Sequence, residues 1–537
     1  MGKKDKNKKK GKGAEKTAAK TEKKLSQKQK KELAAIGEDD IEKIVAEIEL
    51  EEKKRQEVVE IVVPPPSRRV NFTLTAHPEK EELILLGGEY FNGLKTFLYN
   101  DLYFYNIPRN EWVRVKAPGG PPPRCGHQTV ALSSGKGQLW VFGGEYASPT
   151  QAQFYHYKDL WVYHMSMKKW EKINVSGGPS SRSGHRMVCV KKQLIVFGGF
   201  HDNLRDYKYF NDVYAFNLET YTWKRIEPTG TSPAPRSACV MVPLADGRIV
   251  VYGGYRKEKI KRDVDKGVIH TDMFLLTPEK NDTTGLKWKW VAVKQVGARM
   301  SPRCGMTAVM APGNKAYAFG GVWDIEESEE DLAGTFFNDL YALDLDKTTW
   351  RTVTLSGKKD SAKQRRRRKD KGELPEGADN EKDSDTEISE METNEDGTTK
   401  EPPAASSVLS DDGIFKVTVG PSPAASSSQQ ATENTSVGGQ QAFMPSPRMN
   451  CGLAVKHGVL YLYGGLVEDG DKQFTLSDFY SLDLHKMDEW KTLIPNDQAS
   501  QEWLDSSSSS EGSGEDSGSE SDSEDESDKD DTKMEVD

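Results

Sequence analysis

Short runs of alternating apolar and polar residues recur along most of the chain, and glycine or proline separates them. In one stretch, four such runs follow one another: His127–Leu132, Gln138–Phe142, Leu160–His164 and Trp170–Asn174. Alternation with a period of two residues, interrupted by turn residues, is typical of short antiparallel strands. The pattern therefore predicts an all-β body built from four-stranded units.

A pair of glycines ends an apolar run in each of six units. The pairs are Gly87-Gly88, Gly143-Gly144, Gly198-Gly199, Gly253-Gly254, Gly320-Gly321 and Gly464-Gly465. The first five pairs are 55 to 67 residues apart, and the last spacing also falls to 55 when the low-complexity stretch 356–444 is left out. Four-stranded units of this length are typical of propeller blades. We expect a six-bladed β-propeller with four antiparallel strands per blade.

Three further features recur in step with the glycine pairs. An aspartate, an apolar residue and an aromatic residue follow each pair, as in Asp101-Leu102-Tyr103. A tryptophan comes next: Trp112, Trp170, Trp223, Trp290, Trp350 and Trp490. The units begin with an arginine after proline or serine: Ser67-Arg68, less clearly, then Pro123-Arg124, Ser181-Arg182, Pro235-Arg236, Pro302-Arg303 and Pro447-Arg448.

These repeated residues are expected to build the scaffold. The glycines permit positive φ or close approach between blades, the tryptophans fill the space between blades, and the aspartates cap turns. The combination of motifs resembles the kelch repeat, for example in Phe-Gly-Gly-Glu-Tyr at 142–146 and Tyr-His-Tyr-Lys-Asp-Leu-Trp at 155–161. The resemblance covers about 64–495 and implies a protein-interaction propeller with no defined reaction.

Composition divides the chain further. We expect a disordered Lys-rich tail at 1–38, a short amphipathic helix and a closing strand at 39–63, blades 1–5 at 64–355, a disordered insertion at 356–444, blade 6 at 445–495, and a disordered Ser/acidic tail at 496–537. Residues 1–31 carry a net charge of +11 and residues 505–537 a net charge of −12. Segments so charged and so poor in apolar residues cannot bury a core.

The segment 39–63 holds two predicted elements. Ile41, Val45 and Ile48 lie on one face of a helix that Asp39 or Asp40 can cap. The β-branched run that follows ends at three prolines and predicts a strand. We expect this strand to add an edge to blade six and to fasten the ring.

The five cysteines stand apart in the sequence, which argues against a zinc site or a disulfide framework and favours a reducing compartment. No apolar run is long enough to span a membrane. We therefore expect no cofactor, no metal, no membrane partner and a cytoplasmic location. The basic run 363–371 leaves a nuclear share as an alternative.

The segments that follow the glycine pairs are long, aromatic and on one face of the predicted propeller. We expect a monomeric propeller that binds a protein partner, of an identity that the sequence does not give, through this face. The predicted partner-binding residues are Tyr90, Phe91, Tyr146, Tyr155, Phe200, Tyr207, Phe210 and Arg256. The fourth segment is basic and the fifth acidic, a contrast that would orient a charged ligand.

The favoured function is thus a non-catalytic scaffold or adaptor. One alternative is an escort for a basic, RNA-associated client that uses the charged tails, with nucleic acid reached only through the basic tail. A remote alternative is a metal-dependent enzyme, because five equivalent positions could project soft ligands toward the axis. These positions are His127, His185, Cys239, Met306 and Cys451, and core packing is the favoured interpretation of them.

Overall fold

The computed structural model describes residues 40–203, 206–261, 264–326, 332–357, 442–470 and 472–504, which all belong to one compact unit. The predicted tails 1–38 and 505–537, and most of the predicted insertion, lie outside these residues. The described part contains one α-helix, α2 (Ile41–Lys54), which Asp40 caps by accepting a hydrogen bond from the Glu42 amide. No helix among these residues is long and apolar enough to cross a membrane.

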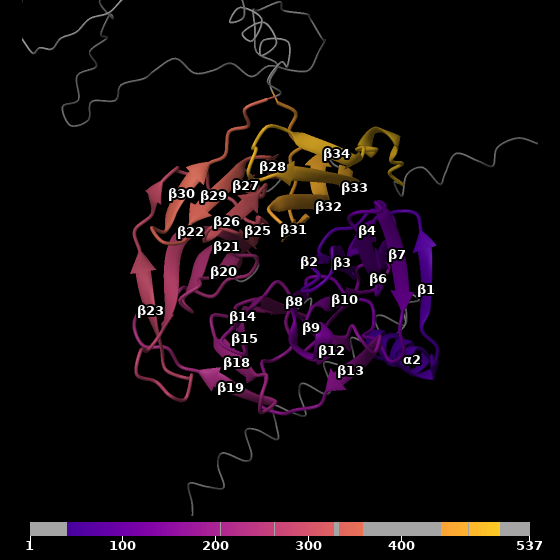
Figure 1. Cartoon of the computed structure of the whole chain (residues 1–537), viewed down its shortest axis with the longest axis horizontal. Helices are drawn as coiled ribbons and strands as arrows, with labels where there is room; N and C mark the ends of the chain where they lie inside the picture. The colour runs from indigo at the N-terminus through magenta and orange to yellow at the C-terminus, as the bar shows by residue number, and fades with distance from the viewer. Residues whose placement is uncertain are drawn as a thin grey trace, which may run out of the picture. The chain divides into compact units, whose positions relative to one another are not determined.

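The described residues form six sheets of four or five strands (Figure 1). Sheet 1 runs β1 (Val59–Val63), β7 (Glu111–Lys116), β6 (Leu102–Asn106), β3 (Glu82–Leu86), β2 (Thr73–Ala76). Sheet 2 runs β13 (Lys169–Ile173), β12 (Leu160–His164), β9 (Gln138–Phe142), β8 (Gln128–Leu132). Sheet 3 runs β14 (Arg186–Val190), β15 (Gln193–Phe197), β18 (Val213–Asn217), β19 (Thr222–Ile226). The strands of sheet 2 confirm the four runs expected from the sequence.

The second half repeats this order, and the two middle strands of sheets 4 and 6 are longer. Sheet 4 runs β20 (Val240–Pro243), β21 (Ile249–Lys261), β22 (Val264–Pro278), β23 (Trp288–Val293). Sheet 5 runs β24 (Val296–Gly297), β30 (Thr349–Thr352), β29 (Leu340–Asp344), β26 (Lys315–Phe319), β25 (Thr307–Ala311). Sheet 6 runs β31 (Gly452–Lys456), β32 (Val459–Asp469), β33 (Lys472–Asp483), β34 (Trp490–Ile494). Four antiparallel strands form the common unit, and β24 adds a parallel strand to sheet 5.

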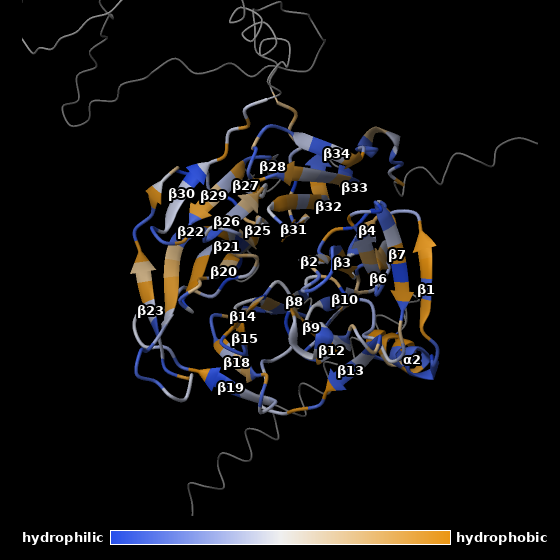
Figure 2. Cartoon of the chain, viewed as in Figure 1, coloured by the Kyte–Doolittle hydropathy of each residue, from blue (hydrophilic) through white to orange (hydrophobic). Residues whose placement is uncertain are grey.

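Hydrophobic clusters join each sheet to the next, and the last cluster joins sheet 6 back to sheet 1. In every cluster the repeated tryptophan from the last strand of one sheet packs against the preceding sheet. At the closing junction, the Trp112 ring lies 5.7 Å from the Tyr463 ring. The apolar faces of the sheets therefore pack against one another around a closed ring, and Figure 2 shows hydrophobic and hydrophilic residues interspersed along the strands. The expected role of the tryptophans is confirmed.

A buried arginine fixes the glycine pair in each sheet. The six arginines are Arg69, Arg124, Arg182, Arg236, Arg303 and Arg448, all at most 4% exposed. Each donates a hydrogen bond to the carbonyl of the first glycine in its own sheet. Each also pairs with the repeated aspartate, at 2.5 to 3.7 Å. The aspartates thus neutralise a buried guanidinium, which is a different role from the expected turn cap.

The backbone of the same arginine reaches the preceding sheet. The amide of the second glycine donates to it in five junctions: Gly88 to Arg124, Gly144 to Arg182, Gly199 to Arg236, Gly321 to Arg448 and Gly465 to Arg69, at 2.9 to 3.3 Å. The first glycine of each of these pairs has positive φ, and a Cβ there would lie 2.2 to 2.8 Å from that carbonyl. Both reasons proposed for glycine, positive φ and close approach, are confirmed.

Two sequence-based expectations about ring closure are wrong. Strand β1 pairs antiparallel with β7 of sheet 1 and not with sheet 6. The ring closes instead through side-chain packing and through hydrogen bonds such as Tyr463 Oη to the Pro66 carbonyl. The arginine that opens the first unit is Arg69, because Arg68 pairs with Asp497 at 2.6 Å.

The predicted boundaries of the tail and the insertion also change. Residues 496–504, expected within the acidic tail, contain a 3₁₀ turn at Gln498–Ser500 and pack on the body. At the start of the insertion, the Ser356 amide donates to the Met487 carbonyl at 2.9 Å. At its end, the Phe443 ring lies 5.6 Å from the Tyr480 ring. A short run of residues at each border therefore belongs to the packed body, because these residues find partners on sheet 6 or on the hairpins.

The buried arginine pairs should dominate local stability. Arg448→Met leaves the fully buried Asp478 carboxylate without its cation, so we expect a loss of about 3–5 kcal/mol in the free energy of unfolding. Arg225→Met, which removes an exposed pair with Glu227, should cost about 1 kcal/mol or less. Urea unfolding of both variants measures the difference, and equal losses would contradict the assigned role.

A pair of glycines separates backbone strain from steric contact. Gly320 and Gly313 both have positive φ, 73° and 78°. A Cβ at 320 would lie 2.2 Å from the Arg448 carbonyl, whereas a Cβ at 313 would meet nothing within 4 Å. We expect Gly320→Ala to destabilise the protein by about 1–3 kcal/mol more than Gly313→Ala. Thermal unfolding of the two variants tests this, and similar melting temperatures would refute the junction contact.

Candidate functional site: a collar of hairpins

A β-hairpin follows the glycine pair in every sheet. Four hairpins are separate ladders: β4 (Glu89–Phe91) with β5 (Thr96–Leu98), β10 (Glu145–Ala147) with β11 (Phe154–His156), β16 (Phe200–Asp202) with β17 (Tyr207–Tyr209), and β27 (Val322–Glu326) with β28 (Leu332–Phe336). In sheets 4 and 6 the hairpin is the outer part of the long strand pairs β21–β22 and β32–β33. We number these hairpins 1 to 6 by sheet and call them together the collar.

Neighbouring hairpins touch, so the collar lies on one face of the ring. The Thr96 amide of hairpin 1 donates to the Pro149 carbonyl of hairpin 2 at 2.8 Å. The Tyr207 hydroxyl of hairpin 3 donates to Asp265 of hairpin 4 at 2.7 Å. The segments expected to be loops are therefore ladders with fixed registers, which makes the surface that they present well defined.

The structure places the predicted partner-binding residues on hairpins 1 to 4. Tyr90 and Phe91 lie on β4, Tyr146 on β10, Tyr155 on β11, Phe200 on β16, Tyr207 on β17 and Arg256 on β21. Phe210 follows β17 and is buried, with the Arg182 guanidinium 4.0 Å from its ring centre. Phe210 therefore contributes to the scaffold, whereas the other side chains are half-buried on the collar.

Helix α2 covers the aromatic side chains of hairpin 2. Ile41 and Val45 are buried against Tyr157, with Tyr146 and Tyr155 packed around them. The Ile41 amide donates to Gln153 Oε1 at 3.3 Å. Two of the predicted partner-binding tyrosines thus already contact an amphipathic helix of the same chain.

The C-terminal end of the described chain covers hairpin 1 in a similar way. The Phe91 ring lies 5.5 Å from the Trp503 ring in an edge-on arrangement. The Leu504 amide donates to the Asn92 carbonyl at 2.9 Å. Trp503 was not among the predicted site residues, because it lies beyond the last repeat and within the expected acidic tail.

Large apolar side chains remain exposed on other parts of the collar. Leu94 is 50% exposed, Phe97 44%, Ile260 56% and Trp323 36%. They belong to hairpins 1, 4 and 5. Sequence reasoning missed Trp323 and Ile260 because it weighted the fourth and fifth segments by charge. Among the charged residues of these two segments, residue 262 and those within 327–331 lie outside the described part of the chain.

The inner rim of the collar changes in character from sheet to sheet. The residue after each glycine pair bridges to the residue after the repeated arginine, next to the innermost strands. These rim residues are Glu89, Glu145, Phe200, Tyr255, Val322 and Leu466. The rim is thus acidic at sheets 1 and 2, aromatic at sheets 3 and 4, and aliphatic at sheets 5 and 6.

The proposed metal ligands are core residues. His127 and His185 are at most 1% exposed, and burial, followed by the charge of Arg124, lowers the pKa of His127 to about 3. Burial likewise raises the pKa of the Cys451 thiol to about 11. Within the described ranges, no group of three His, Cys, Asp or Glu side chains is arranged to hold a metal ion.

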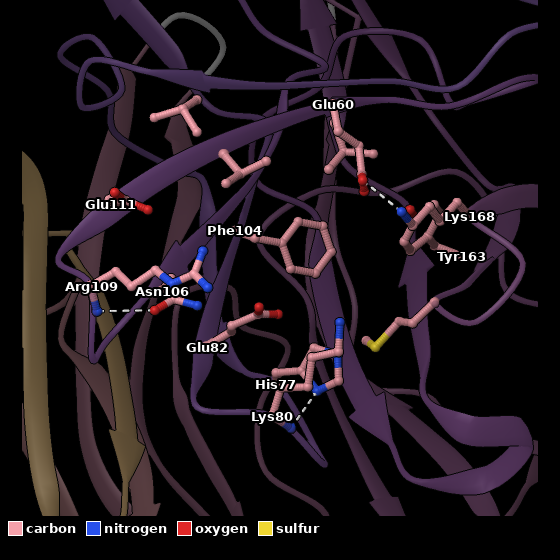
Figure 3. Close-up of a pocket in the computed structure, with 14 residues that line it drawn as sticks. Glu60, His77, Lys80, Glu82, Phe104, Asn106, Arg109, Glu111, Tyr163 and Lys168 are labelled. Carbon is pink, nitrogen blue, oxygen red and sulfur yellow. Dashed lines mark hydrogen bonds and ion pairs between the residues drawn. The ribbon is translucent and has the colours of Figure 1, made fainter.

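A cavity of about 230 Å³ opens between sheets 1 and 2 (Figure 3). Phe104 and Tyr163 line its apolar wall, while Glu82 and Arg109 face it from sheet 1. Its lining includes the turns that follow β2 and β6, the opposite end of those strands from the hairpins. Acidic and basic side chains are mixed around the opening, so its lining indicates no single ligand class.

Comparison with known proteins supports the fold. Residues 69–281 match the family model described as FBX42, beta-propeller domain. Kelch domain-containing protein 2 of Bos taurus is 27% identical over 259 residues, which cover 44% of this chain and 58% of the relative. Kelch domain-containing protein 1 of Homo sapiens is 29% identical over 254 residues, which cover 44% and 57%. The chain thus spans a little over half the length of these curated relatives.

A solved structure entitled "Structure of YjhT" aligns with 80% of this chain and 99% of its own, with a TM-score of 0.45 and 14% identity. The six glycine pairs and the ring of antiparallel sheets agree with the family match and with the kelch-domain relatives. These similarities support a kelch-type β-propeller family for this chain.

Proposed function

We propose that this chain is a non-catalytic, six-bladed propeller that binds a partner protein through its collar. The observation that carries the proposal is the set of exposed apolar side chains on rigid hairpins, Leu94, Phe97, Ile260 and Trp323. Exposed aromatic and aliphatic side chains on a fixed frame are the usual anchors of protein interfaces. The kelch-domain relatives support the same class of function, a protein-interaction module.

Two further features support a binding protein in a reducing compartment. None of the five cysteines forms a disulfide bond, and three of them are buried. Burial raises the pKa of Cys125 and Cys239 thiols, so they are poor nucleophiles. We extend the proposal to a cytoplasmic location on this ground. The escort alternative depends on tails that lie outside the described residues.

The test is affinity capture with the full chain, washed in high salt to remove contacts made by the charged tails. A collar variant carries Phe97→Ala, Ile260→Ala and Trp323→Ala. A control variant carries Met167→Ala, Val175→Ala and Val291→Ala, which remove equally exposed apolar side chains outside the collar. We expect proteins retained by the wild type and the control to fall at least about tenfold with the collar variant.

Two results would contradict the proposal. Equal retention by the collar variant, with an unchanged melting temperature, would show that the collar is not the binding surface. Proteins captured only in low salt, and lost when residues 505–537 are removed, would favour the escort alternative. A melting temperature matched to the wild type is required of both variants, because all six side chains are solvent-exposed.

A further inference from the structure

In the part of the chain that the structure describes, the acidic part of the inner rim has no cation of its own. Glu89 and Glu145 occupy equivalent positions on neighbouring sheets, directly after the glycine pairs. Cys125 lies between them, with its Sγ 4.0 Å from Glu145 Oε1. Each of the six repeated arginines is already paired with an aspartate. Among the described residues, no lysine or arginine forms an ion pair with either carboxylate.

Neutral groups hold both carboxylates in place. Asn71 Nδ2 donates to Glu89 Oε1 at 2.7 Å, and Ser183 Oγ donates to Glu145 Oε2 at 2.9 Å. Burial raises the pKa of Glu89. Burial and the charge of Glu89 raise the pKa of Glu145 to about 8. The pair therefore cannot hold both negative charges near neutral pH without a counter-charge.

A buried histidine beside them is also incompletely satisfied. His156 is 6% exposed, and its Nδ1 lies 3.4 Å from Glu145 Oε2. In the described part of the chain this Nδ1 has no hydrogen-bond partner, whereas Nε2 accepts from the Asp202 amide at 3.1 Å. Because Nε2 accepts, the neutral ring carries its proton on Nδ1, near the carboxylate but without a hydrogen bond to it. The histidine therefore supplies no charge, and its free donor marks a polar group missing from this place.

The rest of the rim suits a side chain with an apolar stem. Phe200 and Tyr255 follow the two glutamates around the rim, and both are half-buried. The Phe200 ring lies 5.5 Å from the His156 ring. A guanidinium or ammonium group beside these carboxylates would place its methylene stem against the aromatic rings.

We propose that Glu89 and Glu145 bind a cationic side chain, arginine or lysine, that the partner protein inserts into the inner rim. The proposal rests on the proposed function, since it names the chemistry by which the collar recognises its partner. Arginine fits the pair better, because its planar fork can engage two carboxylates at once. The main-chain carbonyl or a side-chain oxygen of the same partner segment would accept the His156 Nδ1 proton.

The test titrates the full chain with N-acetyl-arginine amide and with N-acetyl-citrulline amide, a neutral isostere, in high salt. We expect the arginine probe to bind the wild type at least about tenfold more tightly, as charge-assisted hydrogen bonds allow. The preference should vanish in Glu89→Gln with Glu145→Gln. It should persist in Glu219→Gln with Glu227→Gln, which remove two exposed carboxylates outside the collar.

Melting temperatures show whether the variants are folded. Neutralising the pair removes repulsion, so the Glu89→Gln, Glu145→Gln variant should melt no lower than the wild type. The inference is overturned if the two probes bind the wild type equally, or if the folded double variant keeps the preference. If the Glu89→Gln, Glu145→Gln variant also retains the partner protein that the collar variant loses, the inference fails while the proposed function stands. If the collar variant loses nothing, the proposed function fails and the probe titration still decides this site.

Discussion

The buried guanidinium in each sheet is the interaction on which the rest of the propeller depends. A charge without access to water is costly unless it is paired and fully hydrogen-bonded. Each arginine meets this requirement inside its own sheet through the aspartate and the first glycine carbonyl. The same residue presents its carbonyl to the preceding sheet in five junctions. One residue type therefore ties the interior of a sheet to its neighbour, and no side chain larger than hydrogen fits at the first glycine of those junctions.

This constraint also explains where variation is tolerated. The glycine pair occupies the equivalent position in every sheet, so each hairpin starts from an equivalent fixed point. Between that point and the aromatic residue that packs on the repeated arginine in four sheets, the hairpin sequences differ. The rim residue changes from glutamate to phenylalanine, tyrosine, valine and leucine around the ring. A uniform scaffold thus carries a surface of mixed chemistry, which is what selective binding of one partner requires.

The sequence predicted the repeats well because their causes are local and periodic. Strand period, glycine pairs and tryptophans all recur, and recurrence separates scaffold residues from the rest. Contacts that occur only once leave no repeated pattern, so the sequence did not predict them. The apolar pattern of β1 suits the outer edge of either sheet, so the sequence alone does not show that it pairs with β7. Trp503 and α2 pack on hairpins 1 and 2 through surfaces that exist only after the ring has formed. The carboxylate pair at the rim was likewise missed, although Glu145 lies in the quoted Phe-Gly-Gly-Glu-Tyr motif, because glutamate follows the glycine pair in only two of the six units.

The two segments that flank the ring restrict the surface that a partner can reach. Helix α2 packs against the side chains of Tyr146 and Tyr155, and Trp503 packs against that of Phe91. These contacts cover part of the apolar surface of hairpins 1 and 2, where the sequence placed half of the expected binding residues. What stays accessible is Leu94 and Phe97 of hairpin 1 and the apolar surface of hairpins 4 and 5, together with the acidic and aromatic rim. A partner that contacts both must cross the collar toward its centre, so a single extended segment with an apolar anchor and a basic side chain matches this surface better than a flat domain.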